Sequence, residues 1–78
     1  MLTALEVVEK YFLDVRAMIL ELAAFLDRYD RARAQAADSP PEDPRMELLY
    51  QALEVLVDRR ATPNRVERLL MMFSDPAE

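Results

Sequence analysis

Residues 1–37 contain neither glycine nor proline, although five prolines occur elsewhere in the chain. The same stretch is rich in Leu, Ala, Glu, Arg and Met, which are among the strongest helix formers. Because Gly and Pro are the residues that most readily interrupt a helix, nothing in this stretch stops a helix once it has begun. The sequence therefore predicts one helix over about residues 3–37, almost half of the 78 residues.

Proline-containing turns divide the remainder of the chain. The segment 38–44 holds three of the five prolines and ends in Asp43-Pro44, a typical N-cap followed by a first helical residue. Thr62-Pro63 repeats this start signal. We therefore predict an all-α chain that forms a single helical domain over residues 1–78, with the two shorter helices packed back on the long one. The predicted helices are 3–37, 44–60 and 63–73, with a linker over 38–43.

The apolar residues of the 3–37 helix fall on two separate faces. One set recurs at three- and four-residue steps, as in a helix that packs along one side. A second set lies well round the helix and alternates large with small side chains, which favours close approach of another helix. The first set, here the main face, is Leu5, Val8, Phe12, Val15, Ile19, Leu22, Leu26 and Tyr29, widened by Tyr11, Met18 and Phe25. The second set, here the Leu/Ala stripe, is Leu13, Ala17, Leu20 and Ala24.

The 44–60 helix has two apolar faces as well. Its main face is Met46, Leu49, Tyr50, Leu53, Leu56 and Val57, and its second face, here the Leu48 stripe, is Leu48, Ala52 and Val55. A helix that is apolar on two sides needs partners on two sides. We therefore expect the Leu48 stripe to be available to a different, larger protein.

Size arithmetic indicates self-assembly. A helix over 3–37 is about 52 Å long, whereas a compact globule of this chain length is only about 30 Å across. Two short helices laid end to end would cover one side of the long helix and leave the Leu/Ala stripe bare. A core this small seldom leaves a stability margin above ~3–5 kcal/mol. We therefore predict a homodimer in which the long helix meets its twin, with Leu13, Ala17, Leu20 and Ala24 at the self-interface. The antiparallel arrangement is favoured over the parallel one, and a domain-swapped dimer, in which the link at 38–44 passes the second helix to the neighbouring copy, stays open.

The composition excludes several classes of protein. Without His, Cys or Gly, the chain lacks the usual general base, a thiol nucleophile, a thiolate metal site and a glycine-rich phosphate loop. Its net charge of −5 opposes binding to nucleic acids and to anionic membrane surfaces. We therefore expect no enzyme, no cofactor, no nucleic-acid partner and no membrane partner.

The chain also lacks the features of an exported or membrane-spanning protein. Its first twenty residues include Glu6, Glu9 and Asp14 and do not follow the basic-then-apolar pattern of an export signal. Its uncharged runs are shorter than the roughly 18–20 residues that a spanning helix needs. We expect a cytoplasmic location. The preference for Arg over Lys, together with many Ala residues, indicates a GC-rich genome, and we expect a bacterial one.

Carboxylates provide the one chemical alternative to a pure interaction module. Asp14 and Glu21 lie along one edge of the long helix, and Glu47, Glu54 and Asp58 lie along one edge of the next. If the two edges faced each other, they could form an all-oxygen site for Mg²⁺, Mn²⁺ or Ca²⁺. The alternative function is therefore a divalent-metal-binding protein or a metal-dependent hydrolase. The competing interpretation, which we prefer, is an acidic face exposed to solvent.

Two further clusters have simple structural explanations. In the segment 27–33, Arg28, Arg31 and Arg33 beside Tyr29 form a candidate anion site, but interleaved aspartates neutralise it, and we expect Asp27 to pair with Arg31 along the helix. The apolar segment 69–73 is expected to close the core. The function predicted from the sequence is a small, non-catalytic, self-associating module for protein–protein interaction.

Overall fold

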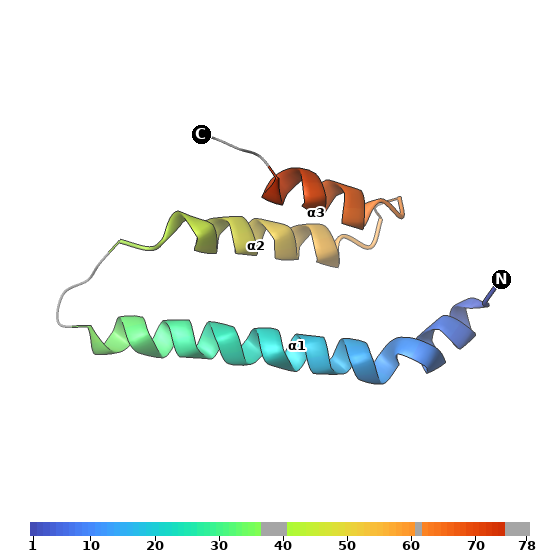
Figure 1. Ribbon diagram of the computed structural model, residues 1–78, viewed down its shortest axis with the longest axis horizontal. Helices are drawn as coiled ribbons and strands as arrows, with labels where there is room; N and C mark the ends of the chain where they lie inside the picture. Colours follow the sequence, from blue (N-terminus) through green and yellow to red (C-terminus); the bar gives the residue numbers. More distant parts are fainter. Residues whose placement is uncertain (37–40, 61, 75–78) are drawn as a thin grey trace. The chain divides into compact units, whose positions relative to one another are not determined.

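A computed structural model shows three helices (Figure 1), and it describes residues 1–36, 41–60 and 62–74. The helices are α1 (Ala4–Gln35), α2 (Pro44–Val57) and α3 (Arg65–Phe73). The described residues contain no strand. The all-α prediction, with one long N-terminal helix and two shorter ones, is therefore confirmed.

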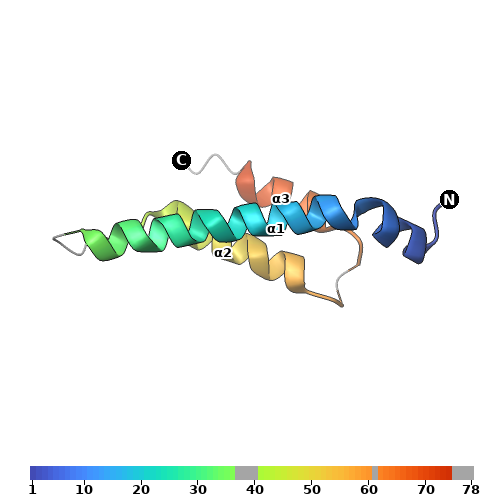
Figure 2. The same cartoon turned by 90° about the horizontal axis from the view of Figure 1, so that it is seen from below.

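Helix α1 begins with a complete capping box. The backbone N–H of Glu6 donates to Thr3 Oγ1 at 3.1 Å, and the backbone N–H of Thr3 donates to Glu6 Oε1 at 2.8 Å. These two bonds satisfy N–H groups that a helix end otherwise leaves without partners. The helix is continuous over 32 residues, although its first turns bend away from the axis of the rest (Figures 1 and 2). The long helix predicted over 3–37 therefore forms, with shorter bounds: Thr3 is its N-cap, and it ends at Gln35 because Ala36 is extended. Residue 37 lies outside the described part of the chain.

Helix α2 begins at the predicted residue and ends earlier than predicted. Asp43 is the N-cap and Pro44 the first helical residue. The predicted end at residue 60 is wrong, because α2 stops at Val57. The Asp58 carboxylate accepts the backbone N–H of Arg60 at 3.0 Å, and this local turn competes with continuation of the helix.

Helix α3 begins two residues after the predicted start. Its N-cap position is occupied by Asn64, and the Thr62 carbonyl accepts the backbone N–H of Asn64 at 2.6 Å. This short turn carries the chain past Pro63 before the helix begins at Arg65. The guanidinium of Arg65 then donates to the backbone carbonyl of Asp58 and so links the end of α2 to the start of α3.

The chain divides into two compact units, Met1–Pro40 and Pro41–Glu78. The first unit contains the single helix α1. In the second unit α2 and α3 contact each other as a hairpin, so the two short helices are not laid end to end as expected. Of the predicted linker, residues 38–40 lie outside the described part of the chain, and 41–43 are non-helical. The packing of the short helices on α1, and the single domain, stay predictions.

Only two apolar residues are buried in the described part of the chain. They are Met46, 4 % exposed, and Ala52, 7 % exposed, and both belong to α2. Neither α1 nor α3 contributes a buried residue. The core is therefore very small for a chain in which 53 % of residues are hydrophobic.

Candidate interaction surface

The main face of α1 is exposed along the N-terminal half of the helix. Five of its large side chains are 46–68 % exposed, and they follow the three- and four-residue steps predicted from the sequence. Leu22, Leu26 and Tyr29, further along the same face, are half-buried. A helix in water gains most of its stability from packing an apolar face, so this exposed face is a candidate surface for a partner. The five exposed residues are Leu5, Val8, Phe12, Val15 and Ile19.

The Leu/Ala stripe is exposed on the same helix. Leu13 is 73 % exposed and Leu20 is 53 % exposed, while Ala17 is exposed and Ala24 is half-buried. All four residues lie within the continuous part of α1. They therefore form an accessible row in which large and small side chains alternate.

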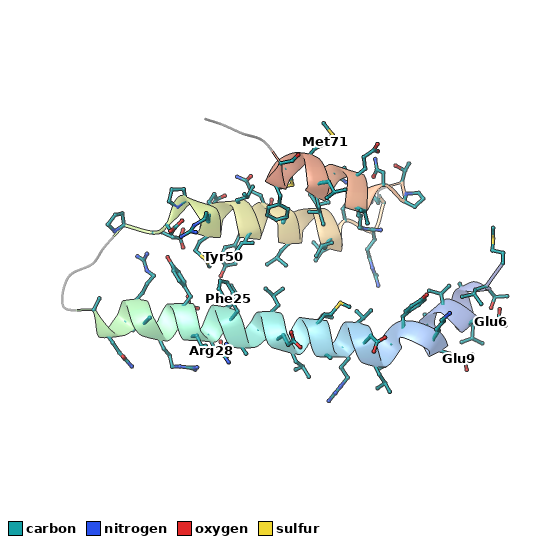
Figure 3. All side chains as sticks on the ribbon, in the orientation of Figure 1. Glu6, Glu9, Phe25, Arg28, Tyr50 and Met71 are labelled. Carbon is teal, nitrogen blue, oxygen red and sulfur yellow. The ribbon has the colours of Figure 1, made fainter. Side chains whose placement is uncertain are left out.

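Near its two ends, α1 carries opposite charges, those of Glu6 and Arg31, that are not used in ion pairs within the described residues. Figure 3 shows Glu6 and Glu9 near its N-terminal end and Arg28 toward its other end. Within the described residues, neither Glu6 nor Arg31 forms an ion pair, and the expected pairing of Asp27 with Arg31 is absent. Both ends of the helix can therefore pair with charges on another molecule.

Two aromatic side chains of α1 contact cations of the same helix. The Lys10 ammonium lies 5.5 Å from the centre of the Tyr11 ring, and the Arg33 guanidinium lies 5.8 Å from that of Tyr29. Arg33 also donates to the Tyr29 hydroxyl at 3.1 Å. The predicted anion site thus has one of its three arginines engaged with Tyr29.

The Leu48 stripe is less accessible than the Leu/Ala stripe. Ala52 is buried, and Leu48 and Val55 are half-buried. Helix α2 therefore offers a weaker surface for a partner than α1 does. Docking of a larger protein on the Leu48 stripe stays a prediction.

Helix α3 exposes more apolar surface than a core-closing helix should. Leu69 and Met72 are half-buried, whereas Leu70 and Met71 are 63 % and 71 % exposed. Figure 3 shows Met71 on the side of α3 away from α2. A shallow depression runs along α3 beside these side chains. It is lined by Pro63, Asn64, Arg65, Val66, Glu67, Leu70, Met71 and Ser74.

The candidate metal ligands are split between the two units. Asp14 and Glu21 belong to α1, Glu47 and Glu54 to α2, and Asp58 follows α2. Among the described residues, no three acidic side chains are grouped so that they could hold a metal ion. The Glu47 carboxylate instead accepts a hydrogen bond from Gln51 Nε2 at 3.2 Å.

An ion pair between Arg45 and Asp43 supports the start of α2. Arg45 donates to both carboxylate oxygens of Asp43, from Nε at 3.0 Å and from its terminal nitrogen at 2.8 Å. The hydrogen bonds from Arg45, side chain first and then backbone N–H, lower the pKa of Asp43 to about 2. Asp43 also raises the pKa of Arg45. Arg45 is exposed and Asp43 is partly exposed, and this geometry is typical of a capped helix start.

No helix in the described ranges has the length and apolar character needed to cross a bilayer. A comparison of the chain with family models, curated proteins and solved structures finds no match.

Proposed function

We propose that this chain is a small, non-catalytic helical module for protein–protein interaction, and that it self-associates through α1. The observation that carries this proposal is the exposure of α1. This 32-residue helix has no buried residue, and large apolar side chains are exposed on two of its faces. A partner that covers one of these faces would remove apolar surface from water, which is the main favourable term in protein association.

The lengths of the elements support a partner from outside the chain. Helix α1 spans about 48 Å, whereas α2 spans about 21 Å and α3 about 14 Å. Because α2 and α3 lie beside each other as a hairpin, their lengths do not add. The hairpin is therefore too short to cover α1 along its length. A second copy supplies a helix of matching length.

The composition of the chain supports binding over catalysis. The chain contains no His and no Cys, and the described carboxylates do not gather into a cluster that could hold a metal ion. The carboxylate of Asp43, whose pKa is clearly lowered, caps α2. The metal-dependent alternative therefore has no structural observation in its favour.

The test is the solution mass by light scattering across a range of protein concentrations. The wild-type chain is expected to have a mass near twice 9.1 kDa, with monomer appearing on dilution. Leu20→Glu places a charge in the Leu/Ala stripe and should give monomer, because burying an unpaired carboxylate is costly.

The matched control is Ala32→Glu. Ala32 is exposed on α1. It continues the seven-residue steps of Tyr11, Met18 and Phe25 at the edge of the main face and lies off the Leu/Ala stripe, so Ala32→Glu adds the same charge without entering the expected contact. It should leave the dimer intact. A wild-type monomer at every concentration would overturn the proposal, and an intact Leu20→Glu dimer would exclude the Leu/Ala stripe as its interface.

A further inference from the structure

We propose that two copies of α1 pair in antiparallel orientation in one specific register, with the symmetry axis between Met18 and Ile19. This inference rests on the proposed self-association and adds its direction and alignment. In this register, the numbers of two residues that lie opposite each other on the two copies always add up to 37. The register follows from three properties of the exposed surface of α1: spacing, side-chain size and charge.

The spacing identifies a continuous seam longer than the Leu/Ala stripe. Extending the stripe in both directions by alternating steps of four and three residues adds two charged residues at each end. Alternating steps of this kind keep side chains on the line where two long helices meet. All eight residues belong to the continuous helix α1. Its first turns, which carry Glu6, bend away from the axis of the rest and would have to straighten against the second copy (Figures 1 and 3). The seam is Glu6, Lys10, Leu13, Ala17, Leu20, Ala24, Asp27 and Arg31.

Side-chain size favours the antiparallel register at the centre of the seam. Leu13 lies opposite Ala24 of the second copy, and Ala17 lies opposite Leu20. Each layer therefore combines one large and one small side chain, which fills space evenly. In a parallel pair each residue would meet its own twin. Layers of two leucines would then alternate with layers of two alanines, and the alanine layers would leave gaps that destabilise packing.

Charge favours the same register at the two ends. Glu6 lies opposite Arg31 of the second copy, and Lys10 lies opposite Asp27. The twofold symmetry makes four layers of opposite charge. In a parallel pair the same side chains would make four layers of like charge, which repel. Asp14 and Glu21 flank the seam and approach each other in the antiparallel pair, but they lie further from the contact line than the four attractive layers.

In the structure, the charges of Glu6 and Arg31 are available to pair across the proposed interface. Neither Glu6 nor Arg31 has an ion pair among the described residues. Glu6 uses Oε1 for the N–H of Thr3, and a carboxylate has further acceptor capacity for a guanidinium. A second copy in this register would therefore satisfy the charge at both ends of the exposed stripe.

Engineered cysteines test the register directly, because the natural chain has none. In the proposed dimer, Glu6→Cys and Arg31→Cys lie opposite each other. Two copies of residue 6 are separated by about 38 Å along the helix, far beyond the Cα distance of a disulfide. An oxidised mixture of the two variants should therefore give the mixed disulfide dimer, and neither variant alone should cross-link.

The control replaces Arg31→Cys with Ala32→Cys. This position is one residue further along α1 but lies off the seam, so its mixture with Glu6→Cys should not cross-link. Light scattering on the same samples separates the possible failures. A dimer in which Glu6→Cys cross-links to itself is parallel, and a dimer without any cross-link has another interface. Either result overturns the register alone, whereas a monomer overturns the proposed function as well.

Charge reversal provides a second measurement without oxidation. Glu6→Arg should raise the dimer dissociation constant by roughly tenfold, because attraction becomes repulsion in two layers. Adding Arg31→Glu should bring the dissociation constant most of the way back to the wild-type value. Both variants lack the Glu6 cap, so their difference reports the charge across the interface. Equal dissociation constants for the two variants would contradict the register.

Discussion

At the residue scale, Asp43 has two roles at the start of α2. Its carboxylate caps the helix through the backbone N–H of Arg45 at 2.8 Å and also binds the Arg45 guanidinium. Both interactions favour the ionised carboxylate, which is why its pKa lies near 2 and below the ordinary value of 3.8. The charge of Asp43 therefore contributes to the start of α2 only while the carboxylate is ionised.

This arrangement predicts a defined pH dependence. A lowered pKa means that the stabilisation is complete above the ordinary pKa and is lost as the pH falls through about 2. Asp43→Asn keeps a side-chain cap acceptor but cannot ionise. The wild-type chain should therefore melt above Asp43→Asn at pH 6, with the difference shrinking between pH 4 and pH 2. A difference that is the same at both ends of this range, measured by circular dichroism, would contradict the role of the charge.

At the element scale, a helix start was predicted correctly where the capping residue and the proline after it are enough to determine it. Asp43-Pro44 predicts the start of α2 to the residue, because Asp caps and Pro fits the first helical position. Thr62-Pro63 is the same kind of signal, a capping residue followed by proline, yet the cap position of α3 is Asn64. The turn between Thr62 and Asn64 shifts that start, and the Asp58 turn shortens α2. Propensity alone does not reveal such local hydrogen bonds.

The Leu/Ala stripe was predicted from the sequence, and its proposed extension into charged residues was not. Helical spacing identified Leu13, Ala17, Leu20 and Ala24, and the structure places all four on one continuous helix. The sequence did not direct attention to Glu6 and Arg31 as members of the same row. Glu6 and Arg31 continue the alternating four- and three-residue steps of the Leu/Ala stripe. A search restricted to apolar residues does not find them, because both are charged.

The hairpin supplies a prediction about packing at the same scale. Ala52 is 7 % exposed, so a larger side chain there has no free space. Ala52→Leu should lower the free energy of unfolding by about 1–3 kcal/mol through overpacking. Gln51→Leu, on the exposed neighbouring position, should change it by less than about 0.5 kcal/mol. Urea denaturation of both variants makes the comparison, and equal destabilisation would show that Ala52 is not packed.

At the scale of the whole molecule, stability and assembly should be linked. The described chain buries only Met46 and Ala52, a core too small to leave much margin by itself. A dimer that forms only from folded chains stabilises the folded state by mass action. The melting temperature should therefore rise with protein concentration, whereas Leu20→Glu should melt at one lower temperature throughout. A wild-type melting temperature that is independent of concentration would contradict this linkage.

The lack of any buried residue in α1 also has a consequence for the motion of its backbone. A helix without a core of its own unwinds easily whenever its partner leaves, and its amide hydrogens then exchange with solvent. Exchange in the middle of α1 would thus report the lifetime of the pair, while exchange in the hairpin would report the opening of a single chain. Exchange rates in α1 and in the hairpin would then report two separate processes, and only the rate in α1 would increase on dilution.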